Sequence, residues 1–362
     1  MNKKIKSNKI LILGGTGAMG SHLVKELRQN PKFEIYVTSR KTYPSTNNVH
    51  YIKGNAMDTV FLDTILQNQY LAIIDFMIYN TNTFKARIKQ LLASTSQYVY
   101  LSSARCYSNT DQLITEDTPR LINTCKDQAY LATDEYALAK GREEDILRKS
   151  NSKNWTIIRP YITFSDYRLQ LGALEKEEWL YRALHGRSII FSEDISSKLT
   201  TLTYGKDVST IIARLIGNPK ALGEIFHITS ETSLKWSDIA NIYIDEIEII
   251  TGKRPRIIME KTSSNLHNPH KKWQIIYDRC YNRQFDNSKI KKVLGTNYPQ
   301  ITKVEEGLRK CIRNFIINPQ YNQINWKKEA LFDRISKERT SLSEIKSLKS
   351  KVKYLLYRYI KK

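Results

Sequence analysis

Tyr136 and Lys140 have the residue types and the spacing that proton transfer to a carbonyl or an alcohol requires. If residues 130–149 form a helix, the two side chains lie one turn apart on the same face. A neighbouring ammonium, with the positive ring of an oxidised nicotinamide, favours phenolate over phenol and lowers a tyrosine pKa from about 10. Such a tyrosine can act as a general acid or base near neutral pH. The spacing alone is a weak signal, because Tyr357 and Lys361 repeat it.

Two serines at the end of an apolar run supply a third group. Ser102 and Ser103 follow residues 97–101, which we expect to form a buried strand. Enzymes built on parallel sheets place reactive groups at the carboxyl ends of strands. We therefore expect Ser103 to hydrogen-bond the reacting oxygen, and Tyr136 and Lys140 to complete the catalytic set. Tyr136 and Lys140 are also expected to contact the cofactor, because the lysine can anchor the nicotinamide ribose. An exposed tyrosine–lysine pair and an ordinary polar strand end is the alternative interpretation.

A glycine-rich turn precedes both features. Gly14, Gly17 and Gly20 are spaced G-x-x-G-x-x-G, after an apolar run and before a helical pattern. The first glycine permits a tight turn, the second lets the backbone approach a pyrophosphate, and the third lets the helix pack closely on the strand. The helix N-terminus then offers free N–H groups to the phosphates. The expected cofactor contacts in this turn are Gly14, Gly17, Ala18, Met19 and Gly20.

The end of the second expected strand bears on the choice of nicotinamide cofactor. An acid there would accept hydrogen bonds from the adenosine ribose and repel a 2′-phosphate. The chain has Ser39 and Arg40 at this point, and no acid. Arg40 can hold a 2′-phosphate, stack on adenine, or belong to a solvated basic loop. We expect Ser39 and Arg40 to contact the cofactor, and NADP(H) to be favoured over NAD(H).

The elements that must position these residues alternate between strand and helix patterns. The expected strands are 9–13, 34–38, 49–53, 72–76, 97–101 and 155–159. Helical patterns at 59–67 and 84–94 fall between them. The alternation predicts an α/β fold with a Rossmann-like, doubly wound parallel sheet.

Beyond this sheet the pattern is less regular, and 362 residues are enough for two lobes. We expect an NAD(P)-binding Rossmann domain at 1–166. A smaller mixed α/β substrate lobe should occupy 167–325, with segments that return to the first domain. A basic helical C-terminal tail should occupy 326–362, where twelve Lys or Arg stand against four Asp or Glu.

Composition argues against several protein classes. Hydrophobic residues make up 41% of the chain and charged residues 26%, which indicates a globular protein. No apolar run approaches the roughly 20 residues that span a bilayer. The four cysteines have no C-x-x-C spacing, and His267 and His270 make no zinc pattern with Cys280. We expect free thiols in a cytoplasmic protein, and no metal.

Four motifs together resemble those of the extended short-chain dehydrogenase/reductases. They are GGTGAMG at 14–20, YLSSARCY at 100–107, DEYALAK at 134–140 and WTIIRP at 155–160. The resemblance is to the NAD(P)-dependent nucleotide-sugar epimerases, dehydratases and ketoreductases, and it covers residues 9–318. It implies that the catalytic serine is Ser103 rather than Ser102, that Asn55 and Ala56 lie near the adenine, and that the chain forms a homodimer.

One departure from the family pattern narrows the reaction. In sugar 4,6-dehydratases an Asp and a Glu follow the catalytic hydroxyl, whereas Ala104 and Arg105 follow Ser103 here. Dehydration is therefore disfavoured, and ketone reduction or epimerisation remains. Because Arg40 suits NADPH, we expect ketoreduction of a nucleotide-activated sugar, in surface polysaccharide precursor synthesis. An epimerase with bound NAD is the first alternative.

Candidate substrate residues follow from the same resemblance. Arginines of the second lobe often bind the diphosphate in this family, and Arg168, Arg182 and Arg187 are candidates because guanidinium suits phosphate. Each can also be an ordinary structural arginine. Tyr161, directly after the Arg-Pro of the fourth motif, is expected to face the sugar.

The net charge of +22 allows two further roles. The second half of the chain also resembles chloroplast stem-loop RNA-binding proteins, which keep this fold, and basic charge suits RNA phosphates. The complete set of Ser103, Tyr136 and Lys140 makes RNA binding the less favoured alternative. The tail segment 349–362 can rest as an amphipathic basic helix on anionic lipid, at the inner membrane face, or it can be a solvated helical end.

Overall fold

The computed structural model describes residues 7–266 and 271–360. His267 and His270, and residues 361–362 of the tail, lie outside the described residues. Within those ranges, no group of three or more His, Cys, Asp or Glu side chains could hold a metal ion. None of the described helices is both long enough and apolar enough to cross a membrane.

Contacts divide the chain into two compact units, each built from separated segments. The first unit comprises Met1–Thr163, Thr201–Thr232 and Gln284–Thr302. The second comprises Phe164–Thr200, Ser233–Arg283 and Lys303–Lys362. The predicted tail therefore belongs to the second unit and is not a separate body.

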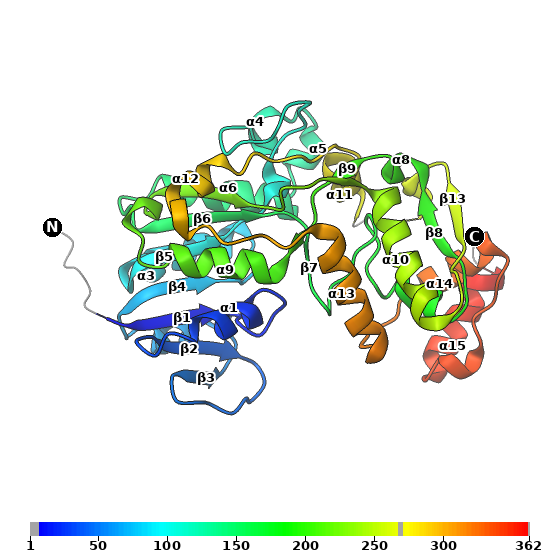
Figure 1. Cartoon of the computed structure of the whole chain (residues 1–362), viewed down its shortest axis with the longest axis horizontal. Coiled ribbons are helices and arrows are strands. Elements are labelled where there is room, and N and C mark those ends of the chain that lie inside the picture. The colour runs from blue at the N-terminus through cyan, green and yellow to red at the C-terminus, as the bar shows by residue number, and fades with distance from the viewer. Residues whose placement is uncertain (1–6, 267–270, 361–362) are drawn as a thin grey trace. The chain divides into compact units, whose positions relative to one another are not determined.

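A seven-stranded parallel sheet forms the centre of the first unit (Figure 1). Its order is β11-β6-β5-β4-β1-β2-β3. The strands are β1 (Lys9–Leu13), β2 (Glu34–Ser39), β3 (Val49–Lys53), β4 (Tyr70–Asp75), β5 (Thr95–Leu101), β6 (Trp155–Pro160) and β11 (Glu224–Ile228). Every neighbouring pair is parallel. The predicted Rossmann-like sheet is confirmed.

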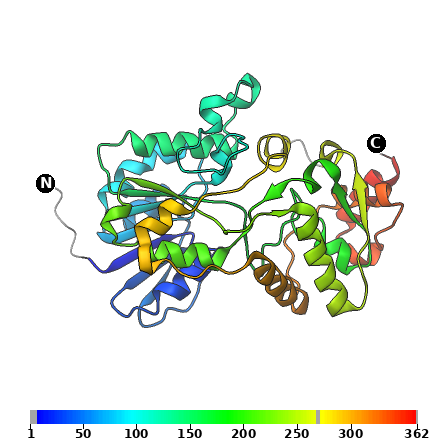
Figure 2. The same ribbon diagram turned by 45° about the horizontal axis from the view of Figure 1, so that its top comes forward.

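Alternating side chains of each strand give the sheet two apolar faces. Ile10 and Ile12 pack on one face and Leu11 and Leu13 on the other. The first face is covered by α1 (Gly20–Leu27), α9 (Gly205–Leu215) and α12 (Ser288–Leu294). The second is covered by α2 (Thr59–Ile65), α3 (Thr81–Ala93) and α6 (Tyr136–Arg148). Figure 2 shows these helices on both sides of the sheet.

Several short elements lie between or after these strands and helices along the chain. In chain order these are η1 (Ala104–Cys106), α4 (Leu121–Thr124), α5 (Gln128–Leu131), β7 (Thr163–Phe164), β10 (Thr203–Tyr204), η2 (Pro219–Ala221) and η6 (Gly295–Asn297). The strand β10 pairs with β7.

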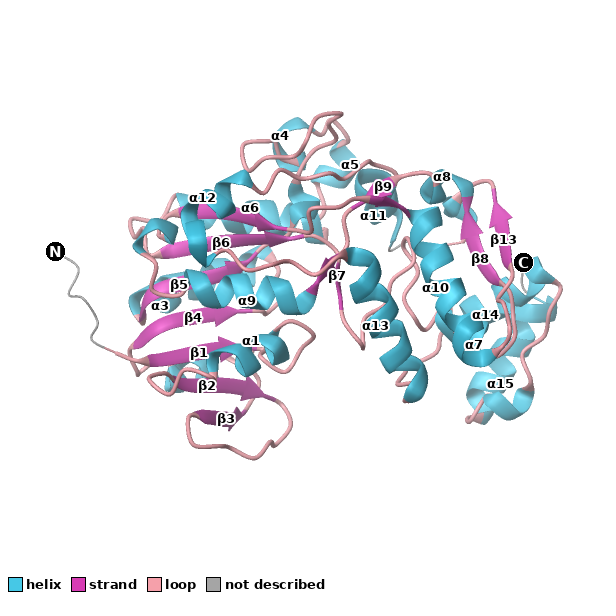
Figure 3. Cartoon of the chain, viewed as in Figure 1, coloured by secondary structure: helices cyan, strands magenta, loops and turns pink. Residues whose placement is uncertain are grey.

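The second unit is mainly helical, with two small two-stranded sheets (Figure 3). In one sheet β8 (Ile189–Ser192) runs parallel to β13 (Ile257–Glu260), and in the other β9 (Leu199–Thr200) runs antiparallel to β12 (Leu234–Lys235). The helical elements are α7 (Leu180–Leu184), α8 (Glu193–Ser196), α10 (Trp236–Thr251), η3 (Ser263–Asn265), α11 (Lys272–Gln274), η5 (Ile275–Arg279), α13 (Val304–Ile317), α14 (Trp326–Ser336), η7 (Leu342–Glu344), α15 (Leu348–Leu355) and η8 (Leu356–Ile360).

Buried ion pairs hold the tail within the second unit. The guanidinium of Arg182, which is fully buried, donates to Glu329 at 2.7 Å and to Asp333 at 2.8 Å, both on α14. It also donates to Glu338 at 3.1 Å. A buried guanidinium needs such partners, because an isolated charge away from water is costly. The tail acids thus compensate a charge in the body of the unit.

Candidate active site

The glycine turn joins β1 to α1 and has the local geometry that a dinucleotide requires. Gly14 has φ of +72°, a conformation that favours glycine. A Cβ atom at Gly20 would lie 2.6 Å from Cα of Gly15, so the helix approaches the strand as closely as backbone allows. A Cβ atom at Gly17, by contrast, would contact only the carbonyl oxygen of Gly14, at 3.8 Å. The turn is open where a pyrophosphate would approach, and its glycines fit that group.

The residues expected at the adenosine lie at the ends of β2 and β3. Ser39 ends β2, is buried, and its hydroxyl accepts a hydrogen bond from the amide of Lys41 at 3.1 Å. Arg40 is exposed directly after it. Asn55 follows β3, and its side-chain oxygen accepts from the amide of Met57 at 3.1 Å. Ala56 is buried beside it.

Arg87, which the sequence analysis did not single out, fixes this second loop. Its guanidinium donates from α3 to the carbonyl oxygens of Ala56 and Met57, both at 3.2 Å. It also lies 4.9 Å from the ring centroid of Tyr79. The buried guanidinium of Arg87 therefore holds the loop that is expected to contact the adenine.

The end of β4 packs against the glycine turn. Asp75 is fully buried, and its carboxylate accepts hydrogen bonds from the hydroxyls of Tyr79 and Tyr98 and from the amide of Met77. Burial raises the pKa of Asp75, although these hydrogen bonds oppose the effect. The sulfur of Met77 lies 3.0 Å from where a Cβ atom of Gly14 would be. Bulky side chains thus border the turn at this strand end.

Two of the three predicted catalytic residues lie on α6, and the third lies directly before η1, which is in contact with α6. Ser103 directly precedes η1, and its hydroxyl accepts from the amide of Arg105 at 3.2 Å. The guanidinium carbon of Arg105 lies 5.3 Å from the ring centroid of Tyr136, the first residue of α6. Nζ of Lys140 lies 5.9 Å from the same centroid. Arg105 therefore connects the serine turn to the tyrosine.

Lys140 is 1% exposed, and its ammonium has partners of its own. Nζ donates to the hydroxyl of Tyr100 at 2.9 Å and lies 3.2 Å from Oε2 of Glu143. Burial raises the pKa of Glu143, and the charge of Lys140 opposes this shift. The expected ammonium is present 5.9 Å from the ring centroid of Tyr136, but it is paired with a carboxylate that the sequence analysis missed.

A second carboxylate on α6 supports the serine turn. Oε1 of Glu144 accepts from the hydroxyl of Ser102 at 2.5 Å and from Nε of Arg159 at 2.8 Å. Nη2 of Arg159 donates to the other oxygen, Oε2, at 2.6 Å. Burial alone would raise the pKa of Glu144, but Arg159 and the other donors hold it below its ordinary value.

The predicted substrate residues have varied surroundings. Tyr161 is almost fully buried, with its ring 5.3 Å from that of Phe285. In the second unit Arg168 is exposed. Arg187 is buried and donates through both terminal nitrogens to Glu344, at 2.8 and 2.9 Å. Arg182 and Arg187 are thus committed to carboxylates of their own unit, which does not favour the expectation that they bind a diphosphate.

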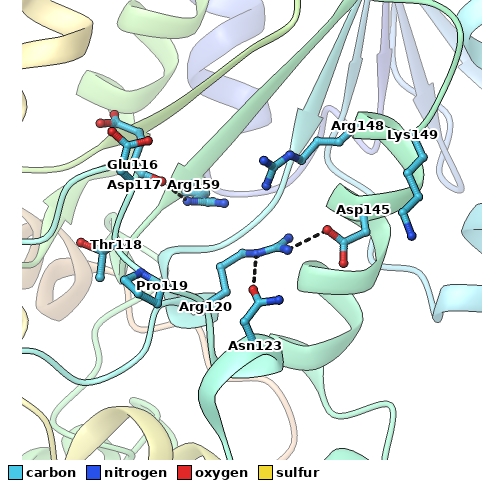
Figure 4. Close-up of a pocket in the computed structure, with 10 residues that line it drawn as sticks. All are labelled: Glu116, Asp117, Thr118, Pro119, Arg120, Asn123, Asp145, Arg148, Lys149 and Arg159. Atoms are coloured by element: carbon cyan, nitrogen blue, oxygen red, sulfur yellow. Dashed lines mark hydrogen bonds and ion pairs between the residues drawn. The ribbon is translucent and has the colours of Figure 1, made fainter.

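A cavity of about 510 Å³ lies beside α6 in the first unit (Figure 4). Its lining residues are Glu116, Asp117, Thr118, Pro119, Arg120, Asn123, Asp145, Arg148, Lys149 and Arg159. Arg120 donates there to Asn123 at 3.2 Å and to Asp145 at 2.7 Å. Ser103, Tyr136 and Lys140 are not among the lining residues, so this cavity is not the predicted catalytic site.

Comparison with known families decides the chain's membership. The model of the NAD dependent epimerase/dehydratase family matches residues 10–229, more than half of the chain. The chain belongs to this family. The matched region contains the glycine turn, the serine turn and the Tyr136–Lys140 pair, so the resemblance inferred from the motifs is confirmed.

Solved structures of this epimerase/dehydratase fold are similar over most of the chain. An epimerase from Methanothermobacter thermautotrophicus is 15% identical with a TM-score of 0.65, covering 86% of this chain and 92% of the other. dTDP-glucose 4,6-dehydratase from Bacillus anthracis, in complex with NAD, is 16% identical with a TM-score of 0.63, covering 86% and 97%. UDP-glucuronic acid 4-epimerase from Bacillus cereus, in complex with UDP-glucuronic acid and NAD, is 16% identical with a TM-score of 0.63, covering 85% and 99%. At these identities the likeness establishes the fold.

One curated relative is named for binding stem-loops and not for an enzymatic activity. Chloroplast stem-loop binding protein of 41 kDa b from Arabidopsis thaliana is 26% identical over 251 residues. The match covers 64% of this chain and 61% of that protein. The chain therefore spans less than two thirds of the length of this relative.

Proposed function

We propose that this epimerase/dehydratase family member is an NAD(P)-dependent oxidoreductase that acts on a nucleotide-activated sugar. The observation that supports this most is the assembly of Ser103, Tyr136 and Lys140 in the unit that carries the open glycine turn. Neighbouring structures were solved with UDP-glucuronic acid or UDP-glucose and NAD. We place the activity in the cytoplasm, in the synthesis of surface polysaccharide precursors.

The side chains have distinct roles in this proposal. A bound nicotinamide cofactor supplies or accepts hydride. Tyr136 gives a proton to the substrate oxygen or takes it away, and the hydroxyl of Ser103 donates a hydrogen bond to that oxygen. The ammonium of Lys140 stabilises the phenolate of Tyr136 through its charge. Gly14, Gly17, Ala18, Met19 and Gly20 hold the pyrophosphate, and Ser39, Arg40, Asn55 and Ala56 hold the adenosine.

We further propose that ketoreduction with NADPH is favoured over epimerisation with bound NAD. Arg40 is exposed at the end of β2, where no acid adjoins it in sequence to repel a 2′-phosphate. Ala104 and Arg105 replace the acid pair that sugar dehydration uses. Tyr161 and Arg168 are proposed substrate contacts; Arg187 would have to exchange Glu344 for the substrate to become one.

A substrate screen tests the proposal. The purified chain is incubated with UDP-, dTDP-, GDP- and CDP-sugars, including 4-keto derivatives, and with NADPH or NADH. Absorbance follows the reduced cofactor, and mass spectrometry follows the product. Net consumption of NADPH supports ketoreduction, and an isomeric product without net oxidation supports the epimerase. Absence of cofactor binding in a calorimetric titration would contradict both.

RNA binding is the second candidate function, because the curated relative is named for binding stem-loops and the net charge is +22. Phosphate contacts make such binding fall steeply with salt. Salt-sensitive retention of a stem-loop RNA, with no affinity for either dinucleotide, would favour this role over the enzyme.

The tail supports a peripheral contact with anionic lipid. Leu348, Val352, Tyr359 and Ile360 are each more than half exposed on α15 and η8, whereas Tyr354 is fully buried. The exposed lysines Lys349 and Lys353 border this apolar face. We expect binding to phosphatidylserine vesicles that the double substitution Leu348→Glu and Val352→Glu abolishes. Equal binding of the variant would contradict the contact.

The proposed homodimer is tested by sedimentation equilibrium.

A further inference from the structure

The ammonium of Lys140 lies in a closed triangle of buried polar groups. Nζ donates to the hydroxyl of Tyr100 at 2.9 Å and lies 3.2 Å from Oε2 of Glu143. The hydroxyl of Tyr100 donates to the same carboxylate oxygen. The Glu143 side chain is fully buried, and that of Lys140 nearly so. A buried ammonium and carboxylate at this separation hold each other in place, since neither has water to replace its partner.

The charges around this triangle come from several elements. Asp75 on β4 is buried and interacts electrostatically with Lys140. Its carboxylate also accepts hydrogen bonds from Tyr79 and Tyr98. Glu144 on α6 acts on Tyr100, and Asp134 acts on Glu143.

The face toward Tyr136 has cations of its own. Arg105 of η1 lies 5.3 Å from the ring centroid of Tyr136 and pairs with Glu135 at 2.7 Å. Nζ of Lys140, one member of the triangle, lies 5.9 Å from that centroid. The carboxylate of Glu143 therefore opposes, at close range, the electrostatic effect of the Lys140 ammonium on Tyr136.

We propose that Glu143 is a positioning residue that holds Lys140 against Tyr100 and offsets its charge, and thereby sets the pH at which Tyr136 ionises. This inference rests on the proposed function only in that Tyr136 is the proton-transfer group. The carboxylate acts through Lys140 and need not touch the substrate. The 3.2 Å separation of Oε2 and Nζ, and the hydroxyl of Tyr100 hydrogen-bonded to both groups, support this role.

Substitution of Glu143 by a neutral residue is therefore expected to favour ionisation of Tyr136. Removing the carboxylate charge leaves the ammonium uncompensated, so a neighbouring anion is stabilised. The phenolate of Tyr136 then forms at lower pH, by on the order of one pH unit for the loss of one nearby like charge. The pH profile of turnover shifts by the same amount in the same direction.

The test is a near-ultraviolet absorbance titration of phenolate, which needs no substrate. Because the chain has 22 tyrosines, the Tyr136 signal is the difference between a protein and the same protein carrying Tyr136→Phe. Glu143→Gln, which keeps the shape and removes the charge, is expected to move this difference signal to lower pH. An unchanged signal, or a shift to higher pH, would overturn the proposal.

Two further variants keep the test decisive if Glu143→Gln folds poorly. Glu143→Asp retains the charge and is expected to titrate like the parent protein. Lys140→Met is expected to move the Tyr136 signal to higher pH by well under ~1 pH unit, because Glu143 already offsets most of the ammonium charge and burial then keeps Glu143 protonated. A larger shift to higher pH would show that Lys140 was uncompensated and would overturn the proposal. Far-ultraviolet circular dichroism checks folding in each case. If no sugar is turned over, the proposed function fails while this titration still gives its answer.

Discussion

Arg159 on β6 and Glu144 on α6 form a fully buried bidentate ion pair, with nitrogen–oxygen distances of 2.8 and 2.6 Å. The same carboxylate accepts from Ser102, the neighbour of Ser103. The pair therefore joins the central sheet to the helix that carries Tyr136 and Lys140.

We predict that Glu144→Gln lowers the free energy of unfolding by about 3–5 kcal/mol, because it leaves Arg159 buried without its counter-charge. The exposed substitution Asp63→Asn on α2 is the control, expected to change it by less than about 0.5 kcal/mol. Urea unfolding measures both. Equal stability of the two variants would contradict the prediction.

The same pair predicts a pH dependence of stability. The folded-state pKa of Glu144 lies below its ordinary value of 4.5, so its contribution is present above pH 4.5 and is lost as the pH falls through the folded-state pKa. Urea midpoints of the parent protein should therefore fall more steeply below pH 4.5 than those of Glu144→Gln. Parallel curves would show that this carboxylate is not the titrating group.

Gly17→Ala should weaken dinucleotide binding with little effect on folding. A Cβ atom there meets almost nothing in the protein, so its methyl group projects where the pyrophosphate would approach. We expect about a tenfold rise in the Kd for NADPH or NADH, which is about 1.4 kcal/mol. Calorimetric titration measures it. Gly20→Ala should instead destabilise the fold, because its Cβ atom would overlap the backbone of Gly15.

Arg40→Ser should reduce the affinity for NADPH by about tenfold and leave that for NADH nearly unchanged, since only NADPH carries the 2′-phosphate. Lys32→Ala, another exposed cation, should change neither. A Kd ratio that stays the same in Arg40→Ser would remove the basis for preferring NADP(H).

Tyr136→Phe should lower kcat by about 100- to 10,000-fold and leave the Kd of the cofactor almost unchanged, because the ring remains and only the acid–base hydroxyl is lost. Steady-state kinetics with the substrate found by the screen measures kcat. Full activity of this variant would exclude Tyr136 as the proton-transfer group.

Arg182→Met should release the tail from the second unit. The substitution leaves Glu329, Asp333 and Glu338 without their shared guanidinium, at a cost of about 3–5 kcal/mol. Limited proteolysis should then cleave within 326–360 faster than in the parent protein. Arg254→Gln breaks only exposed ion pairs and should leave the cleavage pattern as it was.

Local patterns were enough to predict the sheet and the glycine turn. Continuous apolar runs such as 9–13 have few alternatives to a buried parallel strand, and the G-x-x-G-x-x-G spacing belongs to one short segment. The helical pairing of Tyr136 with Lys140 is also local, because both lie within one turn.

The partners of the charged residues were not predictable in the same way. Tyr100 meets Lys140 across a strand–helix contact 40 residues apart, and Glu344 meets Arg187 over 157 residues. Spacing in the sequence reports neighbours along one element, whereas these contacts depend on how distant elements pack. An arginine that looks free for a phosphate in the sequence can therefore already have a carboxylate in the fold.

The buried guanidinium of Arg182 also bears on the order in which the chain matures during synthesis. Its segment leaves the ribosome well before residues 326–338 have been made, so its charge has no internal counter-ion at that stage. The second unit can close only after the last of its three segments has emerged, whereas residues 7–163 already contain six of the seven central strands. A nascent chain stalled before Glu329 would expose the unfinished unit to chaperones and proteases.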